Sequence, residues 1–315
     1  MRVDLAATVT ASPGSGRFGI TEVGILVLTS LVWGAAYVFI RQGIVLGAGP
    51  LAFAAVRYAL SAAAFAGLAL ARRERAPSRE ALLASAVIGG VLVIGLYGGF
   101  LYWGEQSSTG GYAAVLAATA PLLTVIVGFS LLPDERLGTL GLGGIALGLA
   151  GTAVLVYPEL SGSPLGSWQG PIFILAAMVC PASGSVLLRR YGRGRQNLWQ
   201  IGTQFLVAGL ILGIASFAVP GPNALPLTEG VWGSLVFLVV LSSVVGYFAY
   251  YALHFRVGPV RANVVAYLAP LVGLAIGSGI FGEPVTTFEL AGVAVVLAGV
   301  TLVLWEATHR GASPT

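Results

Sequence analysis

Residues 144–151 read Gly-Ile-Ala-Leu-Gly-Leu-Ala-Gly, and residues 292–299 read Gly-Val-Ala-Val-Val-Leu-Ala-Gly. Five of these eight positions are identical, at an offset of 148 residues. At nearly the same offset, Ala120-Pro121-Leu122 recurs as Ala269-Pro270-Leu271, and Gly128 recurs as Gly277. Any single match is weak in a chain so rich in glycine and alanine, but the shared offset predicts that the chain is an internal duplication.

The composition indicates that this chain lies in a lipid bilayer. Apolar residues make up 57% of the sequence and charged residues only 9%, whereas about 25% of the residues in a soluble domain are charged. A bilayer core about 30 Å thick needs about 20 apolar residues per helix. The sequence therefore predicts an all-α polytopic membrane protein with ten transmembrane helices, near residues 21–41, 50–71, 81–102, 108–132, 138–157, 170–190, 197–219, 230–254, 260–282 and 287–306.

Each copy of the duplication contains five predicted spans. Because five is odd, the second copy must enter the membrane in the opposite direction to the first. Inverted repeats are common in transporters, where two related halves exchange inward-open and outward-open shapes around a midplane site. We therefore expect two inverted five-helix repeats, at 20–157 and 168–306, between a disordered cytoplasmic tail at 1–19 and a cytoplasmic tail at 307–315.

The basic residues predict which side of the membrane each loop faces. All 16 are arginines, and basic residues are retained on the cytoplasmic side. Four arginines follow the second predicted span and four follow the sixth, whereas the segments 158–168 and 220–228 contain none. The net charge of +4 is thus read as an insertion signal rather than a nucleic-acid surface. We expect a multi-pass protein of the bacterial inner membrane with both termini in the cytoplasm.

A series of short motifs follows the duplication. The first span contains Val32-Trp33-Gly34-Ala35-Ala36-Tyr37, and the second begins at Pro50 and contains Arg57-Tyr58. Pro121 and Pro270 are followed by the turns Asp134-Glu135-Arg136-Leu137 and Gly282-Glu283-Pro284-Val285. In this order the motifs resemble the drug/metabolite transporter superfamily, specifically its EamA-type ten-helix branch, over roughly residues 20–306. The resemblance implies two inverted five-helix repeats around a central cavity that passes metabolites, often outward.

The second half departs from this pattern, because no arginine of the seventh span matches Arg57. Gln204 or Phe205 occupies that position.

Polar and aromatic side chains identify the spans expected to line the cavity, because lipid-facing positions should be aliphatic. The first, third, fourth, sixth, eighth and ninth spans carry such residues, whereas the fifth and tenth have almost none at mid-depth. The second and seventh spans are expected to flank the cavity. The predicted substrate-binding residues are Trp33, Tyr37, Arg57, Tyr97, Glu105, Tyr112, Thr119, Gln204, Tyr247, Tyr250, Asn263 and Tyr267. Ring faces and hydroxyl groups suit amphipathic solutes such as amino acids, their derivatives or aromatic amines. Aromatic residues near span ends also have a simpler explanation as interfacial belts, and the deeper tyrosines as helix packing.

Arg57 is the charged residue placed most firmly inside a predicted span. An arginine at the bilayer centre costs about 3 kcal/mol on insertion scales, so it needs a partner. One interpretation is structural, with the side chain extending outward to pair with Glu105 or with helix-end carbonyls. The other is functional, with the guanidinium offering two parallel hydrogen bonds to a substrate carboxylate or phosphate.

The repeated prolines and glycines predict local backbone features. Pro121 and Pro270 leave the carbonyls of Ala117 and Ala266 without their helical donors, so we expect kinks that shape the cavity. The alternatives are that these carbonyls bind donor groups of the substrate, or that neighbouring helices or water satisfy them. The pairs Gly144 to Gly148 and Gly273 to Gly277 have the spacing of close helix contacts, either within one chain or between chains. A homodimer is left open.

The function most consistent with these features is an exporter or facilitator of a small metabolite, working by alternating access. No aspartate or glutamate lies at the middle of a predicted span, so we expect facilitated diffusion or exchange, with Glu105 as the best alternative proton carrier. An integral membrane enzyme acting on lipid, or a scaffold without transport, are the competing hypotheses. The chain has one cysteine, two histidines and no HExxH, GxSxG or Walker motif, so no catalytic residue, metal or cofactor is predicted.

Overall fold

The computed structural model describes residues 19–131, 138–160, 168–191, 197–219, 221, 223–257, 262 and 264–310, and regular secondary structure within these ranges is helical. The first half contains α1 (Ile20–Val45), α2 (Pro50–Ala71), α3 (Arg79–Ala84), η1 (Ser85–Leu96), α4 (Tyr97–Gly104), α5 (Gly110–Ala117), α6 (Ala120–Leu131) and α7 (Thr139–Leu160). The second half contains α8 (Gln169–Tyr191), α9 (Leu198–Ala218), α10 (Glu229–Val236), η2 (Phe237–Val245), α11 (Gly246–Val257), α13 (Val265–Phe281) and α14 (Thr287–Arg310). Of the predicted tails at 1–19 and 307–315, residues 1–18 and 311–315 lie outside the described residues, whereas residues 307–310 belong to α14.

Seven helical stretches in the described part of the chain are long and apolar enough to cross a membrane: Ile20–Val45, Pro50–Ala71, Arg79–Gly104, Gly110–Val127, Thr139–Pro158, Leu198–Ala218 and Glu229–Leu253. Three further apolar helices, Gln169–Gly184, Val265–Phe281 and Thr287–Val303, are shorter. Helix thus occurs in each predicted span, although the predicted ninth span begins within the described residues at Val265 rather than at 260. The chain is an all-helical membrane protein in the part that the structure describes.

Two of the long stretches contain a π-helical segment. In Arg79–Gly104 the middle turns form η1, and in the stretch from Glu229 to Val257 they form η2. The two segments fall at corresponding positions of the two halves, close to the 148-residue offset. π-Helical turns are uncommon and are often found at functional sites.

The two repeated prolines behave differently. The predicted span at 108–132 is interrupted after Ala117, and α6 begins at Ala120. Pro121 cannot donate to the carbonyl four residues earlier, and the chain turns through the bonds from Ala118 N to Val115 O and from Thr119 N to Leu116 O. Pro270, in contrast, lies inside the continuous helix α13. The first proline breaks its helix, while the second is accommodated within it.

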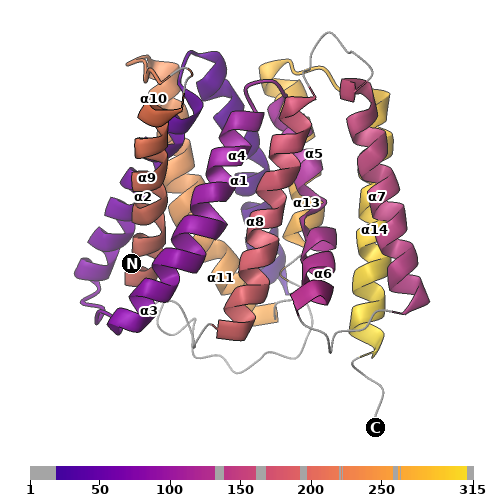
Figure 1. The fold of residues 1–315 in the computed structure, drawn as a ribbon, viewed down its shortest axis with the longest axis horizontal. Coiled ribbons are helices and arrows are strands. Elements are labelled where there is room, and N and C mark those ends of the chain that lie inside the picture. The colour runs from indigo at the N-terminus through magenta and orange to yellow at the C-terminus, as the bar shows by residue number, and fades with distance from the viewer. Residues whose placement is uncertain are drawn as a thin grey trace.

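Contacts between the halves come in related pairs. Helix α1 packs against α13 and α11, and its counterpart α8 packs against α6 and against η1 and α4. Helices α2 and α9 pack against each other, as do α7 and α14. Figure 1 shows the α7–α14 pair at one end of the long axis and the α2–α9 pair at the other.

The α7–α14 pair is held at short range by the glycines of the repeated stretch. A Cβ on Gly299 would lie 2.5 Å from the nitrogen of Gly148 and 2.6 Å from the oxygen of Gly144. A Cβ on Gly151 would lie 2.7 Å from the nitrogen of Val296. The two backbones can approach this closely only because these positions lack a side chain. This α7–α14 seam therefore assigns the Gly144 to Gly148 spacing to a contact within one chain.

Carboxylates of each half accept hydrogen bonds from backbone N–H groups at helix starts of the other half. Both oxygens of Glu283, in the turn after α13, accept hydrogen bonds from Gly110 N and Gly111 N at the start of α5, at 2.9 and 2.8 Å. Glu74, after α2, accepts from Leu198 N at the start of α9 at 2.8 Å. Glu306 of α14 accepts from Gly141 N near the start of α7. Acidic groups at helix N-termini satisfy free N–H groups and oppose the helix dipole.

Candidate functional site

A cavity of about 330 Å³ lies between the two halves of the bundle. Its described lining residues come from α1, α2, η1, α4, α5, α6, α8, α9, η2, α11 and α13, and no described residue of α7 or α14 lines it. This agrees with the prediction that the fifth and tenth spans stay outside the cavity. Helices α2 and α9 contribute only three described lining residues, which are Arg57, Tyr58 and Phe205.

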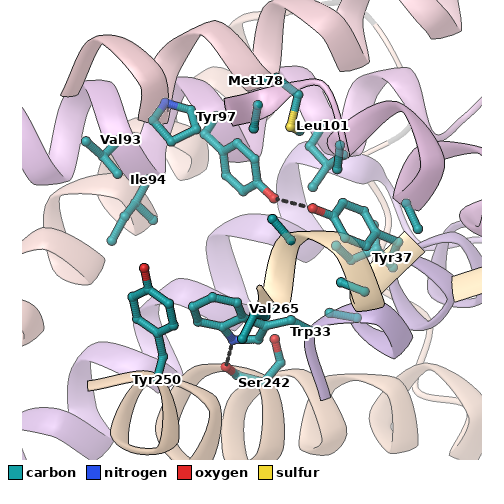
Figure 2. A pocket seen from close by; sticks show the side chains of 18 of the residues that line it. Trp33, Tyr37, Val93, Ile94, Tyr97, Leu101, Met178, Ser242, Tyr250 and Val265 are labelled. Atoms are coloured by element: carbon teal, nitrogen blue, oxygen red, sulfur yellow. Dashed lines mark hydrogen bonds between the residues drawn. The ribbon is translucent and has the colours of Figure 1, made fainter. Parts of the chain in front are cut away.

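Aromatic side chains form two sides of the cavity. On one side the hydroxyl oxygens of Tyr37 and Tyr97 lie 3.4 Å apart. On the other side, the Trp33 ring lies 4.9 Å from the Tyr250 ring, centroid to centroid, and the Trp33 indole donates to the Ser242 carbonyl at 3.2 Å. Figure 2 shows these two groups facing each other across the cavity, with the Tyr250 hydroxyl directed into it. The arrangement offers ring faces at one side and a pair of hydroxyl groups at the other.

Trp33 is fixed in place by the irregular backbone of the eighth predicted span. The Ser242 carbonyl that accepts its indole N–H lies in the π-helical segment η2. Gly246 follows η2, and a Cβ there would lie 2.5 Å from the indole nitrogen. Glycine at position 246 is therefore needed for the Trp33 indole to pack against this helix.

Arg57 is the one charged side chain among the described residues that line the cavity. It is 9% exposed, and its two terminal nitrogens donate to Tyr102 Oη at 2.9 Å and to Ser242 Oγ at 3.0 Å. Its Nε has no hydrogen-bond partner among the described residues. These contacts hold the guanidinium in the cavity wall while leaving its charge uncompensated.

The structural interpretation of Arg57, as a side chain paired with Glu105 or with helix-end carbonyls, predicted the wrong partners. Arg57 does not extend outward to pair with Glu105, because neither carboxylate oxygen of Glu105 has a hydrogen-bond partner among the described residues. Tyr102 and Ser242 hold the guanidinium at the cavity instead. The ion pair that the structure does describe joins Arg256 of α11 to Glu22 of α1 at 2.9 Å.

The structure brings together about half of the predicted substrate-binding residues. Those that line the cavity are Trp33, Tyr37, Arg57, Tyr97, Tyr247 and Tyr250, together with the predicted kink residue Pro270. Glu105, Tyr112, Thr119, Gln204 and Tyr267 do not line it. Asn263 lies outside the described residues.

The polar residues placed away from the cavity are engaged elsewhere. The Tyr112 hydroxyl donates to the Leu155 carbonyl at 3.0 Å, and the Thr119 hydroxyl donates to the Leu116 carbonyl at 2.7 Å. The Tyr267 hydroxyl is directed to Thr301 of α14. Tyr112 and Thr119 thus bind backbone carbonyls, and none of these three side chains lines the cavity.

Gln204 and Glu105 are also buried, and neither side chain lines the cavity. Gln204 is packed against η1 at Gly89, where a Cβ would overlap its side chain. Its neighbour Phe205 takes the cavity position instead. Glu105 is fully buried and lies directly after α4, on the same helical face as the lining residues Tyr97 and Leu101.

Several lining residues were not predicted, because they carry no polar signal. They are mostly small or apolar: Ala36, Ala114, Ala117, Ala120, Met178, Pro181, Val265, Ala266 and Ala269. Ala120 and Ala269 directly precede the repeated prolines. Ala117 and Ala266, four residues before these prolines, also line the cavity, and the carbonyls that the prolines leave without a helical donor were the sequence signal for this part of the wall.

Comparison with known proteins identifies relatives along most of the chain. The model of the EamA-like transporter family matches residues 21–157 and 168–305. The uncharacterized inner membrane transporter YedA of Escherichia coli strain K12 is 32% identical over 288 residues, covering 89% of this chain and 89% of that protein. Protein PecM of Dickeya dadantii is 26% identical, covering 86% of this chain and 88% of that protein. The WAT1-related protein At3g02690 of Arabidopsis thaliana is 25% identical, covering 93% of this chain and 71% of that protein.

A solved crystal structure supports the fold. It has a TM-score of 0.61 and 21% sequence identity, and the match covers 93% of this chain and 99% of the other. At this identity the likeness concerns the fold alone.

Proposed function

Because this chain belongs to the EamA-like transporter family of the drug/metabolite transporter superfamily, we propose that it moves small amphipathic metabolites across the membrane by alternating access. We assign it to export of these metabolites, or to their facilitated passage down a gradient. The observation that carries this proposal is the aromatic cavity of about 330 Å³ between the two halves.

The proposed architecture is a ten-helix bundle of two inverted five-helix repeats, at 20–157 and 168–306, with both termini in the cytoplasm. The family model matches the chain twice, at 21–157 and 168–305. The related pairs of contacts, α1 with α13 and α8 with α6, are those expected of an exchange of the two halves. In such folds the substrate binds near the midplane, between the repeats, and one half rocks against the other.

The proposed substrate is a small molecule with an apolar or aromatic body and an acidic group. Trp33, Tyr247 and Tyr250 present ring faces, while Tyr37 and Tyr97 present hydroxyl groups. Arg57 is the one described charge in the wall, and a desolvated cation without a counter-ion favours an anion. The volume lies at the small end of the usual range for ligand pockets. Carboxylates of amino-acid size, including amino acids and aromatic acids, fit this description.

A melting-temperature screen tests the substrate class. The purified protein is heated with aromatic and aliphatic amino acids, aryl carboxylic acids, the matching carboxamides and the matching amines. A ligand at 100 times its Kd stabilises the folded form by about 2.7 kcal/mol, so binders raise the melting temperature. We expect carboxylates to raise it and the matching amines to leave it unchanged.

Flux measurements then test the function itself. Each stabilising carboxylate is loaded into proteoliposomes, and counterflow of its radiolabelled form is measured against protein-free liposomes. Counterflow above that background supports the proposal. Stabilising ligands that show no counterflow would point to a binding scaffold, and a chemical product formed in detergent would point to an enzyme.

A further inference from the structure

A buried carboxylate lies just beyond the cavity. Glu105 directly follows α4, and its side chain is 0% exposed. Leu101, four residues earlier on the same helical face, lines the cavity and is 1% exposed. At 1.5 Å per residue, Glu105 is about 6 Å farther along the helix axis. The positive-inside assignment places this end of the bundle on the outer side of the membrane.

The Glu105 carboxylate differs from those of Glu283 and Glu289 in having no hydrogen-bond partner among the described residues. Both of its oxygens are unpartnered among the described residues. Glu283 and Glu289, in contrast, accept hydrogen bonds from backbone nitrogens at helix starts. An ionised carboxylate that is buried without partners is very costly, whereas the neutral carboxylic acid is much less so. Burial without a hydrogen-bond partner therefore favours the neutral form of Glu105.

The cations near Glu105 are engaged with other groups. Arg41 of α1 donates to the carbonyl oxygens of Glu105 and Gln106 at 2.6 and 2.8 Å, rather than to the carboxylate. Arg57 of α2 is engaged by Tyr102 and Ser242. The other titratable groups within electrostatic range are the Glu283 carboxylate and the hydroxyl groups of Tyr37, Tyr58 and Tyr102. From α8, Gly170 and Ile174 lie directly against Gly104 at the end of α4, and neither carries a charge.

A second, smaller hollow lies beside the segment that follows Glu105. Its volume is about 60 Å³, which is room for about two water molecules. Arg41 lines it, together with Ser107, Ser108 and Thr109 of the segment that follows Glu105. Arg41 thus contacts the hollow on one side and the Glu105 carbonyl on the other. A proton that leaves Glu105 would have water as its acceptor at this end of the bundle.

We propose that Glu105 is a proton-binding site of the transport cycle, occupied while the outer end of the cavity is closed. When that end opens, the carboxyl group releases its proton to water in the hollow, and the carboxylate pairs with the Arg41 guanidinium. Proton binding at Glu105 then favours closure, and proton release favours opening. This inference rests on the proposed transport function, since it needs an outer end that opens.

Labelling with a carbodiimide tests the proton site without any transport assay. Dicyclohexylcarbodiimide is an apolar reagent that reacts with protonated carboxyl groups in apolar surroundings, and peptide mapping locates the adduct. In wild-type protein in nanodiscs, we expect labelling at Glu105 at least about tenfold above that at Glu283 or Glu289, falling as the pH rises. A water-soluble carbodiimide should label Glu105 much less.

Variants and ions sharpen this test. Arg41→Gln removes the cation that would stabilise the carboxylate, so labelling of Glu105 should persist to a pH about one unit higher or more. Arg72→Gln is the matched control, because Arg72 lies at the C-terminal end of α2 over the Phe248 ring and lines neither hollow, and it should leave the labelling of Glu105 unchanged. Absence of labelling at Glu105 in wild-type protein, or equal labelling by the water-soluble reagent, would overturn the proposal. Protection by Na⁺ but not by choline would also overturn it, because Glu105 would then be a sodium site.

The outcome is independent of whether the chain transports the proposed substrates. If Glu105 is labelled as expected but no counterflow is found, the proton site stands and the proposed function fails. If counterflow is found but Glu105 is unlabelled, the proposed function stands and the proton site fails.

Discussion

The α7–α14 seam and the wall of the central cavity are both made of apolar sequence, but their side chains are used in opposite ways. In the seam, Gly144, Gly148 and Gly299 let two backbones touch, and no described residue of either helix reaches the cavity. Around the cavity, large rings such as Trp33 and Tyr97 keep the helices apart and enclose space. Small residues in the seam therefore set the helix positions, while large ones in the wall define a binding site. Substitutions in the two regions should accordingly affect different properties, stability in the first and ligand binding in the second.

The largest effect is expected for Gly299→Leu in the seam. Its Cβ would lie 2.5 and 2.6 Å from backbone atoms of α7, which cannot move aside as a side chain could. Overpacking typically costs about 1–3 kcal/mol, and we expect the upper end of this range here because the neighbouring atoms belong to the backbone. We expect a sharp fall in folded, monodisperse protein and in melting temperature, measured by fluorescence-detected size exclusion and thermal unfolding.

The matched control for this substitution is Gly143→Leu. A Cβ at Gly143, on the outer face of α7, meets no atom within 4 Å, so leucine there should leave the melting temperature nearly unchanged. Equal losses for both variants would contradict the seam as the site that positions these helices.

The next largest effect is expected for Arg57→Gln in the cavity wall. Hydrogen bonds to a charged group contribute about 2 kcal/mol, which corresponds to about a thirtyfold loss of affinity for carboxylate ligands. Affinity for the matching carboxamides should change little. Arg57→Lys should not restore carboxylate binding, because an ammonium group cannot contact Tyr102, Ser242 and the ligand with the geometry of a guanidinium.

Arg72→Gln is the control for this variant, because Arg72 lies at the end of the same helix and packs over the Phe248 ring outside the cavity. Titration calorimetry or ligand-induced melting shifts measure both variants. Undiminished carboxylate affinity in Arg57→Gln would remove the anion from the proposed substrate class.

A moderate effect is expected for the double variant Tyr37→Phe with Tyr97→Phe. The hydroxyl oxygens of these residues lie 3.4 Å apart, and their loss removes the polar groups from one side of the cavity. A neutral hydrogen bond contributes about 1 kcal/mol, so affinity should fall about fivefold, less than for Arg57→Gln. Tyr157→Phe, on the exposed face of α7, should have no effect on affinity. A double variant that binds as the wild type does would show that these hydroxyl groups do not contact the ligand.

The smallest effect is expected for Tyr267→Phe. This tyrosine was predicted to line the cavity, but its hydroxyl is directed to Thr301 of α14. Ligand affinity should therefore stay within about twofold of wild type, which is less than 0.5 kcal/mol. A loss as large as that in the Tyr37 and Tyr97 double variant would mean that the cavity extends to this face of α13 in another conformation.

The sequence predicted the positions of the helices and about half of the site, for a physical reason. Hydropathy predicts the spans because the lipid solvent acts on each of them. The duplicated stretches show which spans of the two halves correspond. Trp33, Tyr97 and Tyr250 line the cavity as expected, whereas Tyr112 and Tyr267, which carry the same type of aromatic side chain, do not. The glycine spacing predicted a close helix contact, but the spacing of glycines on one helix does not identify the helix that packs against it.

The remaining site residues could not be predicted, because polarity alone does not say where a group finds its partner. Thr119 and Tyr112 satisfy backbone carbonyls, one of them three residues away and the other on α7. Pro121 and Pro270 stand in the same three-residue motif, yet one interrupts its helix and the other does not. Such differences depend on tertiary neighbours that a single sequence does not display.

Cysteine accessibility measures the central claim most directly, namely that the cavity is the transport path and the seam is not. In a Cys180→Ala background, Ala120→Cys and Ala266→Cys place thiols in the cavity wall, and Val296→Cys places one in the seam. A membrane-impermeant maleimide is applied separately to right-side-out and inside-out vesicles. We predict that both cavity cysteines are labelled from each side and that Val296→Cys is labelled from neither. Labelling of the cavity cysteines from one side only, or labelling in the seam, would contradict the account.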